Sequence, residues 1–190
     1  LDYLDYHQGE TEHFINSLTT NLTSFFREAH HFEQLAEYLH VHPEPLRIWC
    51  TASSSGEEPY SIAMTCAEAR GSLNTNVKIY ASDIDSRMLE RAKAGIYPID
   101  QVEKLSLARR KRFFHRGTGS NAGKARVADE LRNSIYFFQQ NLLAPQYSLE
   151  PGLDIVFCRN VMIYFDKPTQ EIILNRIVKL IKPNGWYVAG

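Results

Sequence analysis

The chain has 190 residues and a formal net charge of -1 at pH 7. This length suits one domain with a substantial core, and the balanced charge disfavours a nucleic-acid binder, a class that usually has a strong basic excess. No apolar run reaches the ~18 residues that a membrane span needs, and no secretory signal is recognisable. Cys50, Cys66 and Cys158 form neither a C-x-x-C pair nor a disulfide framework, which suits a reducing cytoplasm. We expect no metal site, because the histidines lack the spacing of metal ligands.

The first 40 residues predict a helical lead-in. Residues 1–10 show no clear periodicity, and residues 12–18 are compatible with a short helix. From His31 to His40, apolar residues recur on one helical face and predict a second helix, which the prolines at 43 and 45 end.

A strand, a loop of small residues and a helix follow. The apolar run 46–50 predicts a buried strand, and residues 57–70 predict a helix that either serine of the pair 54–55 can cap. This unit is the first half of a nucleotide-binding α/β fold. The acids Glu57 and Glu58 at the helix start disfavour a phosphate group there, so we expect a nucleoside that is neutral or cationic near them.

A second unit of the same kind comes next. Residues 77–82 predict a strand, and Asp85 or Ser86 can cap a helix that ends at Gly95. Strands that alternate with helices at this spacing imply a parallel sheet with right-handed crossovers. Asp83 directly follows the strand, where an acid commonly binds the two ribose hydroxyls of a nucleoside. The alternative role for Asp83 is a helix cap, which its neighbours already offer.

The loop of small residues at 51–56, which we call the first loop, also limits the choice of cofactor. It departs from the G-x-G-x-x-G pattern, because Gly56 is its only glycine. A pyrophosphate needs close approach to the backbone, so NAD and FAD are disfavoured. S-adenosylmethionine is the commonest nucleoside cofactor without phosphates and fits better.

The alternation breaks in the middle of the chain. We expect a helix and a small antiparallel insert at about 105–138, with a glycine-rich turn at 117–123. Residues 135–139 return to the main sheet. The basic cluster at 109–116 is either a solvated helix face or a patch for an acidic protein partner.

The last part of the chain predicts two more strands. The first is the apolar run 153–158, followed by a loop or turn at 161–165 and a helix over 166–181. A turn at 182–185 leads into the second strand at 186–190, and the sheet is expected to continue beyond it.

Polar residues follow the first of these strands. Arg159, Asn160 and Tyr164 should lie at the carboxyl edge of the sheet, the region where open α/β sheets bind ligands. The alternative for Arg159 is a structural role, paired with a buried acid.

Four segments together resemble the CheR-type chemotaxis receptor methyltransferases. They are TNLTSFFRE at 20–28, SSGEEPYSIA at 54–63, ASDID at 81–85 and FCRNVMIYF at 157–165. They occur in one order at family-like spacing, and the resemblance covers nearly the whole chain from about Asn16. It implies an α/β, Rossmann-like class I S-adenosylmethionine-dependent methyltransferase, with a mostly parallel sheet, helices on both faces and a small antiparallel β-subdomain.

The resemblance also implies a division of the chain. Residues 1–40 would be the lead-in that carries a cofactor-contacting motif, and residues 41–190 the methyltransferase domain with its C-terminal strands missing. By the same resemblance, the family's small basic N-terminal domain, apart from its last helix, and its later His-Ser-Glu motif would also be missing from these residues. These departures put receptor docking in question more than cofactor binding.

The implied reaction is transfer of a methyl group from S-adenosylmethionine to receptor glutamates, which forms methyl esters and leaves S-adenosylhomocysteine. Glu58 would meet the methionine end of the cofactor and Asp83 its ribose. The implied cofactor-binding residues are Asn21, Thr23, Arg27, Glu58, Asp83, Asn141, Leu142, Cys158 and Arg159. The residues implied to stand nearest the transferred methyl are Arg27, Arg159 and Tyr164.

The implied partner is the cytoplasmic domain of a chemoreceptor. In some members of the family the β-subdomain tethers the enzyme to a pentapeptide at the receptor C-terminus, and the short glycine-rich turn resembles that class. The alternative is a plain surface hairpin. We expect a cytoplasmic monomer that binds no nucleic acid and does not insert into membranes.

Other functions remain open from the sequence. The chain could methylate another protein or a small molecule, since the cofactor site would look the same. It could instead be a non-catalytic module that binds S-adenosylmethionine or tethers to receptors. A nicotinamide-linked oxidoreductase is disfavoured by the glycine-poor loop and the acidic helix start.

Overall fold

The structure is a computed structural model, and it describes residues 23–190. The helix expected at 12–18 and the candidate residue Asn21 lie outside the described residues. In the described part of the chain, no helix combines the length and apolarity needed to cross a membrane.

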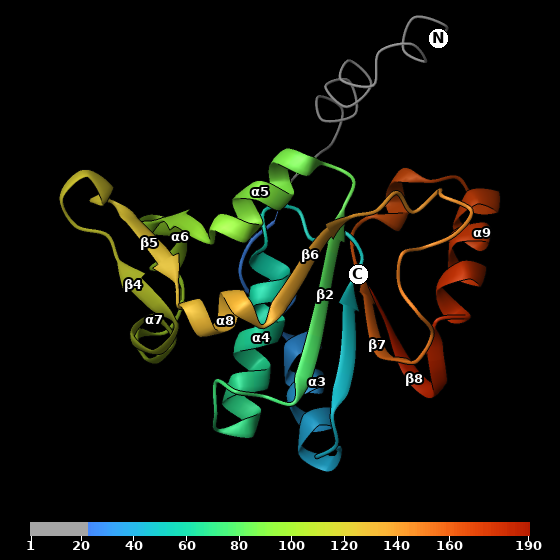
Figure 1. Cartoon of the computed structure of the whole chain (residues 1–190), viewed down its shortest axis with the longest axis horizontal. Helices are drawn as coiled ribbons and strands as arrows, with labels where there is room; N and C mark the ends of the chain where they lie inside the picture. The colour runs from blue at the N-terminus through green and yellow to red at the C-terminus, as the bar shows by residue number, and fades with distance from the viewer. Residues whose placement is uncertain (1–22) are drawn as a thin grey trace, which may run out of the picture.

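Five parallel strands form the main sheet, in the order β6-β2-β1-β7-β8 (Figure 1). Their bounds are β1 (Leu46–Cys50), β2 (Val77–Asp83), β6 (Ile135–Gln139), β7 (Leu153–Cys158) and β8 (Ile181–Ala189). The register aligns Cys50 with Ala81 on one side and with Phe157 on the other. The carboxyl ends of the central strands therefore meet at one edge, as the alternation of strands and helices predicts.

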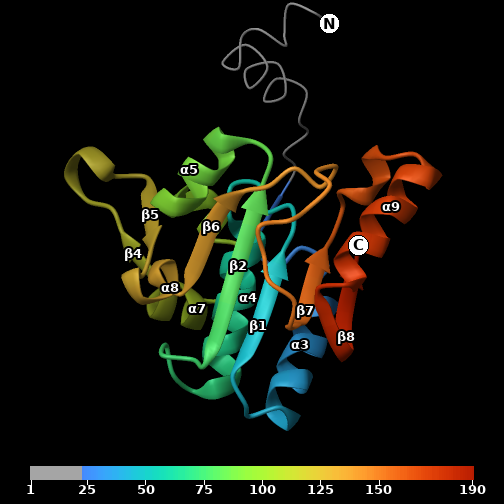
Figure 2. The same cartoon turned by 45° about the vertical axis from the view of Figure 1, so that its right-hand side comes forward.

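Helices cover both faces of this sheet (Figures 1 and 2). Among the described residues these helices are α3 (His30–Val41), α4 (Glu57–Arg70), α5 (Ser86–Ala94) and α9 (Lys167–Val178), which follows β7. In β1, Ile48 packs in the core that α3 and α4 share, whereas Trp49 packs in a second core with Ile173 of α9. Because successive side chains of a strand point to opposite faces, these two cores lie on opposite sides of the sheet. The predicted fold class is confirmed.

The insert is a three-stranded antiparallel sheet in the order β3-β5-β4. Its strands are β3 (Ile96–Pro98), β5 (Lys124–Val127) and β4 (Phe114–Arg116). The helical pieces around it are α6 (Ile99–Val102), α7 (Leu107–Phe113), η1 (Gly119–Asn121) and α8 (Asp129–Asn133), which leads into β6. The sheet takes its first strand from before the expected range of 105–138, and the stretch 135–139 pairs in the main sheet.

The end of the chain differs from the expected turn. Residues 182–185 lie within β8, where the pairing with β7 slips between Leu153 and Ile155. Asn184 adopts a left-handed conformation there, with φ of 66°. The Pro-Asn-Gly sequence therefore forms an irregularity in the strand and not a turn between a helix and a strand.

Gly56 occupies the N-cap position of α4, and neither serine of the pair 54–55 caps the helix. Instead, the Ser55 hydroxyl donates to the Glu57 carboxylate at 2.7 Å. Gly56 has a φ of 101°, and a Cβ built on it would lie 2.8 Å from the Tyr97 hydroxyl oxygen and 2.9 Å from Ala92 Cβ. The glycine is therefore required by the packing of β3 and α5 against the first loop, and not only by a ligand.

The substitution Gly56→Ala should lower the free energy of unfolding by about 3 kcal/mol, through a strained φ and a steric clash. Gly71→Ala is the matched control, since Gly71 also has a positive φ but a Cβ there meets nothing within 4 Å. We expect it to lose only about 1 kcal/mol. Urea unfolding measures both values, and equal losses would refute the packing argument.

Candidate functional site

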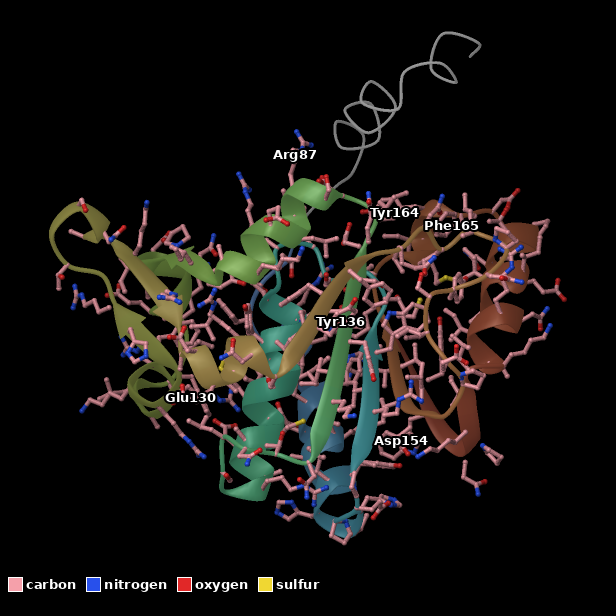
Figure 3. The ribbon with its side chains drawn as sticks, in the orientation of Figure 1. Arg87, Glu130, Tyr136, Asp154, Tyr164 and Phe165 are labelled. Carbon is pink, nitrogen blue, oxygen red and sulfur yellow. The ribbon has the colours of Figure 1, made fainter. Side chains whose placement is uncertain are left out.

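The loops that follow the parallel strands meet at the carboxyl edge of the main sheet. The Thr51 amide donates to the Phe157 carbonyl at 2.9 Å, and the Ser53 amide donates to the Ser82 carbonyl at 2.8 Å. In Figure 3, Tyr164 lies at the end of the sheet toward which the arrows of Figure 1 point, whereas Asp154 lies toward the other end. This edge collects the described candidate residues on adjacent loops.

Asp83 ties the first loop to the end of β2. Its carboxylate accepts hydrogen bonds from the Ser54 amide at 2.7 Å and the Asp85 amide at 2.9 Å. Burial raises the pKa of Asp83 above its usual value. The cap of α5 is Asp85, whose side chain accepts from the amides of Arg87 and Met88, as predicted. Asp83 is thus not needed as a helix cap, and its role toward a ribose stays a prediction.

The side chain of Arg159 forms the centre of the site. It lies at the end of β7 and is only 1% exposed. One guanidinium nitrogen donates to Glu58 Oε2 at 2.5 Å. The other donates to the carbonyl of Arg27 at 2.6 Å and lies 3.1 Å from Glu28 Oε2. We call these groups the Arg159 clamp: the Arg159 guanidinium, the carboxylates of Glu58 and Glu28, and the carbonyl of Arg27.

The two carboxylates of the clamp differ in their environment. Burial raises the pKa of Glu58, although the charge of Arg159 and hydrogen bonds from Cys50 and Arg159 act against it. Partial burial also acts to raise the pKa of Glu28, but hydrogen bonds from Arg159 and Asn160 outweigh it, so its pKa is lowered. Glu28 therefore supplies a stable negative charge beside Arg159. The sequence motif at 20–28 contains Glu28, but nothing in the pattern indicated its role.

The loop at 24–28 places Arg27 at this edge. Phe26 and Glu28 both adopt left-handed conformations, with φ of 53° and 56°. The Phe26 amide donates to the Ser61 hydroxyl at 2.9 Å, which ties the loop to α4. The Arg27 side chain remains 41% exposed, with its Nε 3.8 Å from the Glu28 carboxylate. Thr23 is half-buried at the start of this loop.

The remaining candidates lie around the same edge. The Asn141 side chain accepts from the Leu143 amide at 2.8 Å, and Leu142 is buried in the core that contains Trp49. Cys158 is buried, and burial raises the pKa of its thiol, so it is not an activated thiolate. Tyr164 is 58% exposed in the short helix η2 (Met162–Tyr164).

The polar groups at this edge fit a ligand with hydroxyls and a cationic group. The Ser53 hydroxyl is buried and has no hydrogen-bond partner among residues 23–190. A ligand can therefore supply the missing hydrogen bond. Glu58 and Asp83 offer carboxylates and would repel a phosphate. Across the described residues, no group of three or more His, Cys, Asp or Glu side chains could hold a metal ion.

Arg159→Ala should lower the free energy of unfolding by about 3 kcal/mol, because it leaves the buried Glu58 carboxylate unpaired. Loss of the arginine should also raise the pKa of Glu58 further. A carboxyl with a raised pKa in the folded state costs stability as the pH rises through that pKa, so the deficit should be smaller near pH 5 than near pH 8.

The control is the double variant Arg159→Ala with Glu58→Gln, which removes the unpaired charge and should recover part of the lost stability. Urea unfolding at the two pH values tests this. A deficit that is independent of pH and unchanged by Glu58→Gln would contradict the pairing.

Two relatives from chemotaxis illustrate what the chain is similar to. It is 55% identical to chemotaxis protein methyltransferase 2 of Pseudomonas aeruginosa, over 99% of this chain and 68% of that protein. It is 51% identical to the chemotaxis protein methyltransferase of Escherichia coli, over 97% of this chain and 64% of that protein. The chain thus spans about two thirds of the length of these curated relatives.

A solved structure supports the fold. A putative O-methyltransferase from Nostoc punctiforme superposes with a TM-score of 0.50 and 18% identity, over 85% of this chain and 36% of that one. The model of the CheR methyltransferase SAM-binding domain matches residues 21–190. The predicted cofactor, S-adenosylmethionine, is confirmed by this match. The chain belongs to the CheR methyltransferases, which are S-adenosylmethionine-dependent enzymes, and it carries the cofactor-binding domain of that family.

Proposed function

We propose that this chain methylates glutamate side chains on the cytoplasmic helices of a chemoreceptor, forming methyl esters. The observation that carries the proposal is the 55% identity, over 99% of the chain, to a protein named chemotaxis protein methyltransferase 2. Because the chain spans about two thirds of that relative, the substrate and the partner of the whole protein are part of the proposal.

The chemistry of the acceptor suits the groups at the site. A glutamate side chain is already ionised at pH 7, so the transfer needs no strong general base. Bound S-adenosylmethionine supplies an activated methyl group on a positively charged sulfur. The protein then has to align the acceptor oxygen with that methyl group and to exclude water.

The carboxylates at the carboxyl edge would hold the cofactor. Glu58, buried beside Arg159, would take the ammonium group of its methionine end. Asp83 would accept from its ribose hydroxyls. Asn141 and Leu142, after β6, would flank the adenine, and Cys158 would form part of the floor.

Arg27 and Tyr164 would meet the acceptor. The Arg27 side chain is 41% exposed and the residue Tyr164 is 58% exposed at the same edge, so an incoming carboxylate can reach them. A guanidinium holds a carboxylate through two parallel hydrogen bonds, and a tyrosine hydroxyl can orient one of its oxygens. Arg159 would act differently, because its guanidinium already binds Glu58, Glu28 and a carbonyl; it would hold the loop that presents Arg27.

The insert is the part that would engage the receptor C-terminus. His115 and Arg116 are exposed on β4, an edge strand of the antiparallel sheet, and would suit an acidic peptide. The three described cysteines are free and buried, which is compatible with the cytoplasmic location that we propose.

The test of the function is incorporation of radiolabelled methyl groups from S-adenosylmethionine into receptor cytoplasmic fragments, followed by treatment with base. We expect the label to be released as methanol, because carboxyl methyl esters are base-labile. Base-stable label would indicate N-methylation, and absence of label with retained cofactor binding would indicate another substrate or a non-catalytic module.

Two variants separate cofactor binding from turnover in the same assay. Asp83→Ala should abolish measurable binding of S-adenosylhomocysteine in calorimetry, since the ribose loses its acceptor and the first loop loses its tie to β2. Tyr164→Phe should retain that affinity within about twofold and lower turnover by roughly tenfold, the effect of about 1.4 kcal/mol. Unchanged affinity in Asp83→Ala would refute the ribose assignment.

A further inference from the structure

The loop at 24–28, which carries Arg27, rests against the insert as well as against the main sheet. The ring of Phe25 packs edge-on against Tyr97 of β3, with centroids 4.9 Å apart. It also packs edge-on against Phe114 of β4, at 5.5 Å. Aromatic pairs in this arrangement are favourable beyond the area that they bury. The antiparallel sheet therefore supports this loop through Phe25.

A single arginine of the insert covers the next residue of the loop. The guanidinium carbon of Arg109, in α7, lies 3.7 Å from the centre of the Phe26 ring. Its Nε and one Nη both donate to the carboxylate of Glu68 in α4, each at 2.8 Å. This bidentate pair fixes the plane of the guanidinium, and the fixed plane lies over the ring.

Phe26 needs such support, because its backbone is in an unfavourable conformation. Its φ of 53° is in the left-handed region, which a bulky residue rarely adopts. Its amide donates to the Ser61 hydroxyl, and that hydroxyl donates in turn to the Glu57 carbonyl. The ring of Phe32 packs against Phe26 at a centroid distance of 5.1 Å. These contacts fix the residue directly before Arg27.

The basic cluster at 109–116 is thus not uniform. Arg109 binds Glu68 and covers Phe26, whereas Lys111 on the same short helix is exposed, and its side chain forms no hydrogen bond or ion pair with a described residue. Neither a solvated face nor a patch for an acidic partner accounts for Arg109.

We propose that Arg109 is a positioning residue for methyl transfer. Together with Glu68 it holds the Phe26 ring in place, and so fixes the backbone that presents Arg27. The inference rests on the proposed function in one respect, namely that Arg27 acts on the cofactor or the acceptor. It assigns the insert a second task besides any contact with a receptor, because Tyr97, Phe114 and Arg109 of the insert pack against the loop at 24–28.

Hydrogen exchange of the peptide covering residues 23–29, measured by mass spectrometry, tests the proposal without a methyl acceptor. We expect Arg109→Ala to speed exchange of this peptide about fivefold, the factor that corresponds to about 1 kcal/mol of lost stacking and pairing. Lys111→Ala is the matched control: it removes the same charge from the same helix, and exchange should stay at the level of the unsubstituted chain. Arg109→Lys keeps the charge but loses the planar fork, so it should behave like Arg109→Ala.

The second readout is affinity for S-adenosylhomocysteine, compared with urea unfolding of the same variants. We expect Arg109→Ala to bind about fivefold more weakly than Lys111→Ala. Exchange of peptides from β1 and β7 should stay unchanged, which would exclude general loosening of the fold.

Unchanged exchange at 23–29 in a folded Arg109→Ala variant would overturn the proposal, as would full recovery by Arg109→Lys. A different outcome is faster exchange at 23–29 in Arg109→Ala, together with an unsubstituted chain that does not methylate receptor fragments. Arg109 would then still support the loop, and the proposed acceptor would be refuted.

Discussion

The buried guanidinium of Arg159 is the interaction on which the site depends. It joins three parts of the chain that are distant in sequence: the end of β7, the start of α4 through Glu58, and the loop at 24–28 through Glu28 and the Arg27 carbonyl. A buried charge is costly unless it is paired and hydrogen-bonded, so each partner restricts where the others can lie. The first loop, the 24–28 loop and the end of β7 consequently have one mutual arrangement.

The loop that presents Arg27 is held by two separate parts of the structure. Arg159 binds its backbone from the main sheet, and Arg109 covers Phe26 from the insert. Left-handed conformations at Phe26 and Glu28 cost ~1–3 kcal/mol each and persist only where surrounding contacts impose them. Such local strain is common where a fold has to present a particular side chain. Arg27 combines a fixed backbone with a side chain that remains accessible.

Much of this fold could be predicted, because the apolar runs at 46–50, 135–139 and 153–158 coincide with strands. Other features depend on contacts that no local pattern contains. The Glu28 carboxylate accepts a hydrogen bond from the Asn160 side chain, which lies 132 residues away in sequence. The three-residue strand β3 is too short to carry a periodic signal. Likewise, the small residues of the first loop suggested room for a ligand, but the packing that requires Gly56 involves Tyr97 and Ala92, which only the tertiary fold brings there.

The most direct test of this account is nitrogen NMR of the arginine guanidinium groups in the chain with bound S-adenosylhomocysteine. If Arg159 is fixed by Glu58, Glu28 and the Arg27 carbonyl, rotation about its guanidinium bonds should be slow, and its two Nη nitrogens should give separate signals. The signals would be assigned by their loss in Arg159→Lys, and they should merge in the double variant Glu28→Gln with Glu58→Gln. A single averaged Nη signal for Arg159 in the unsubstituted chain would contradict the account.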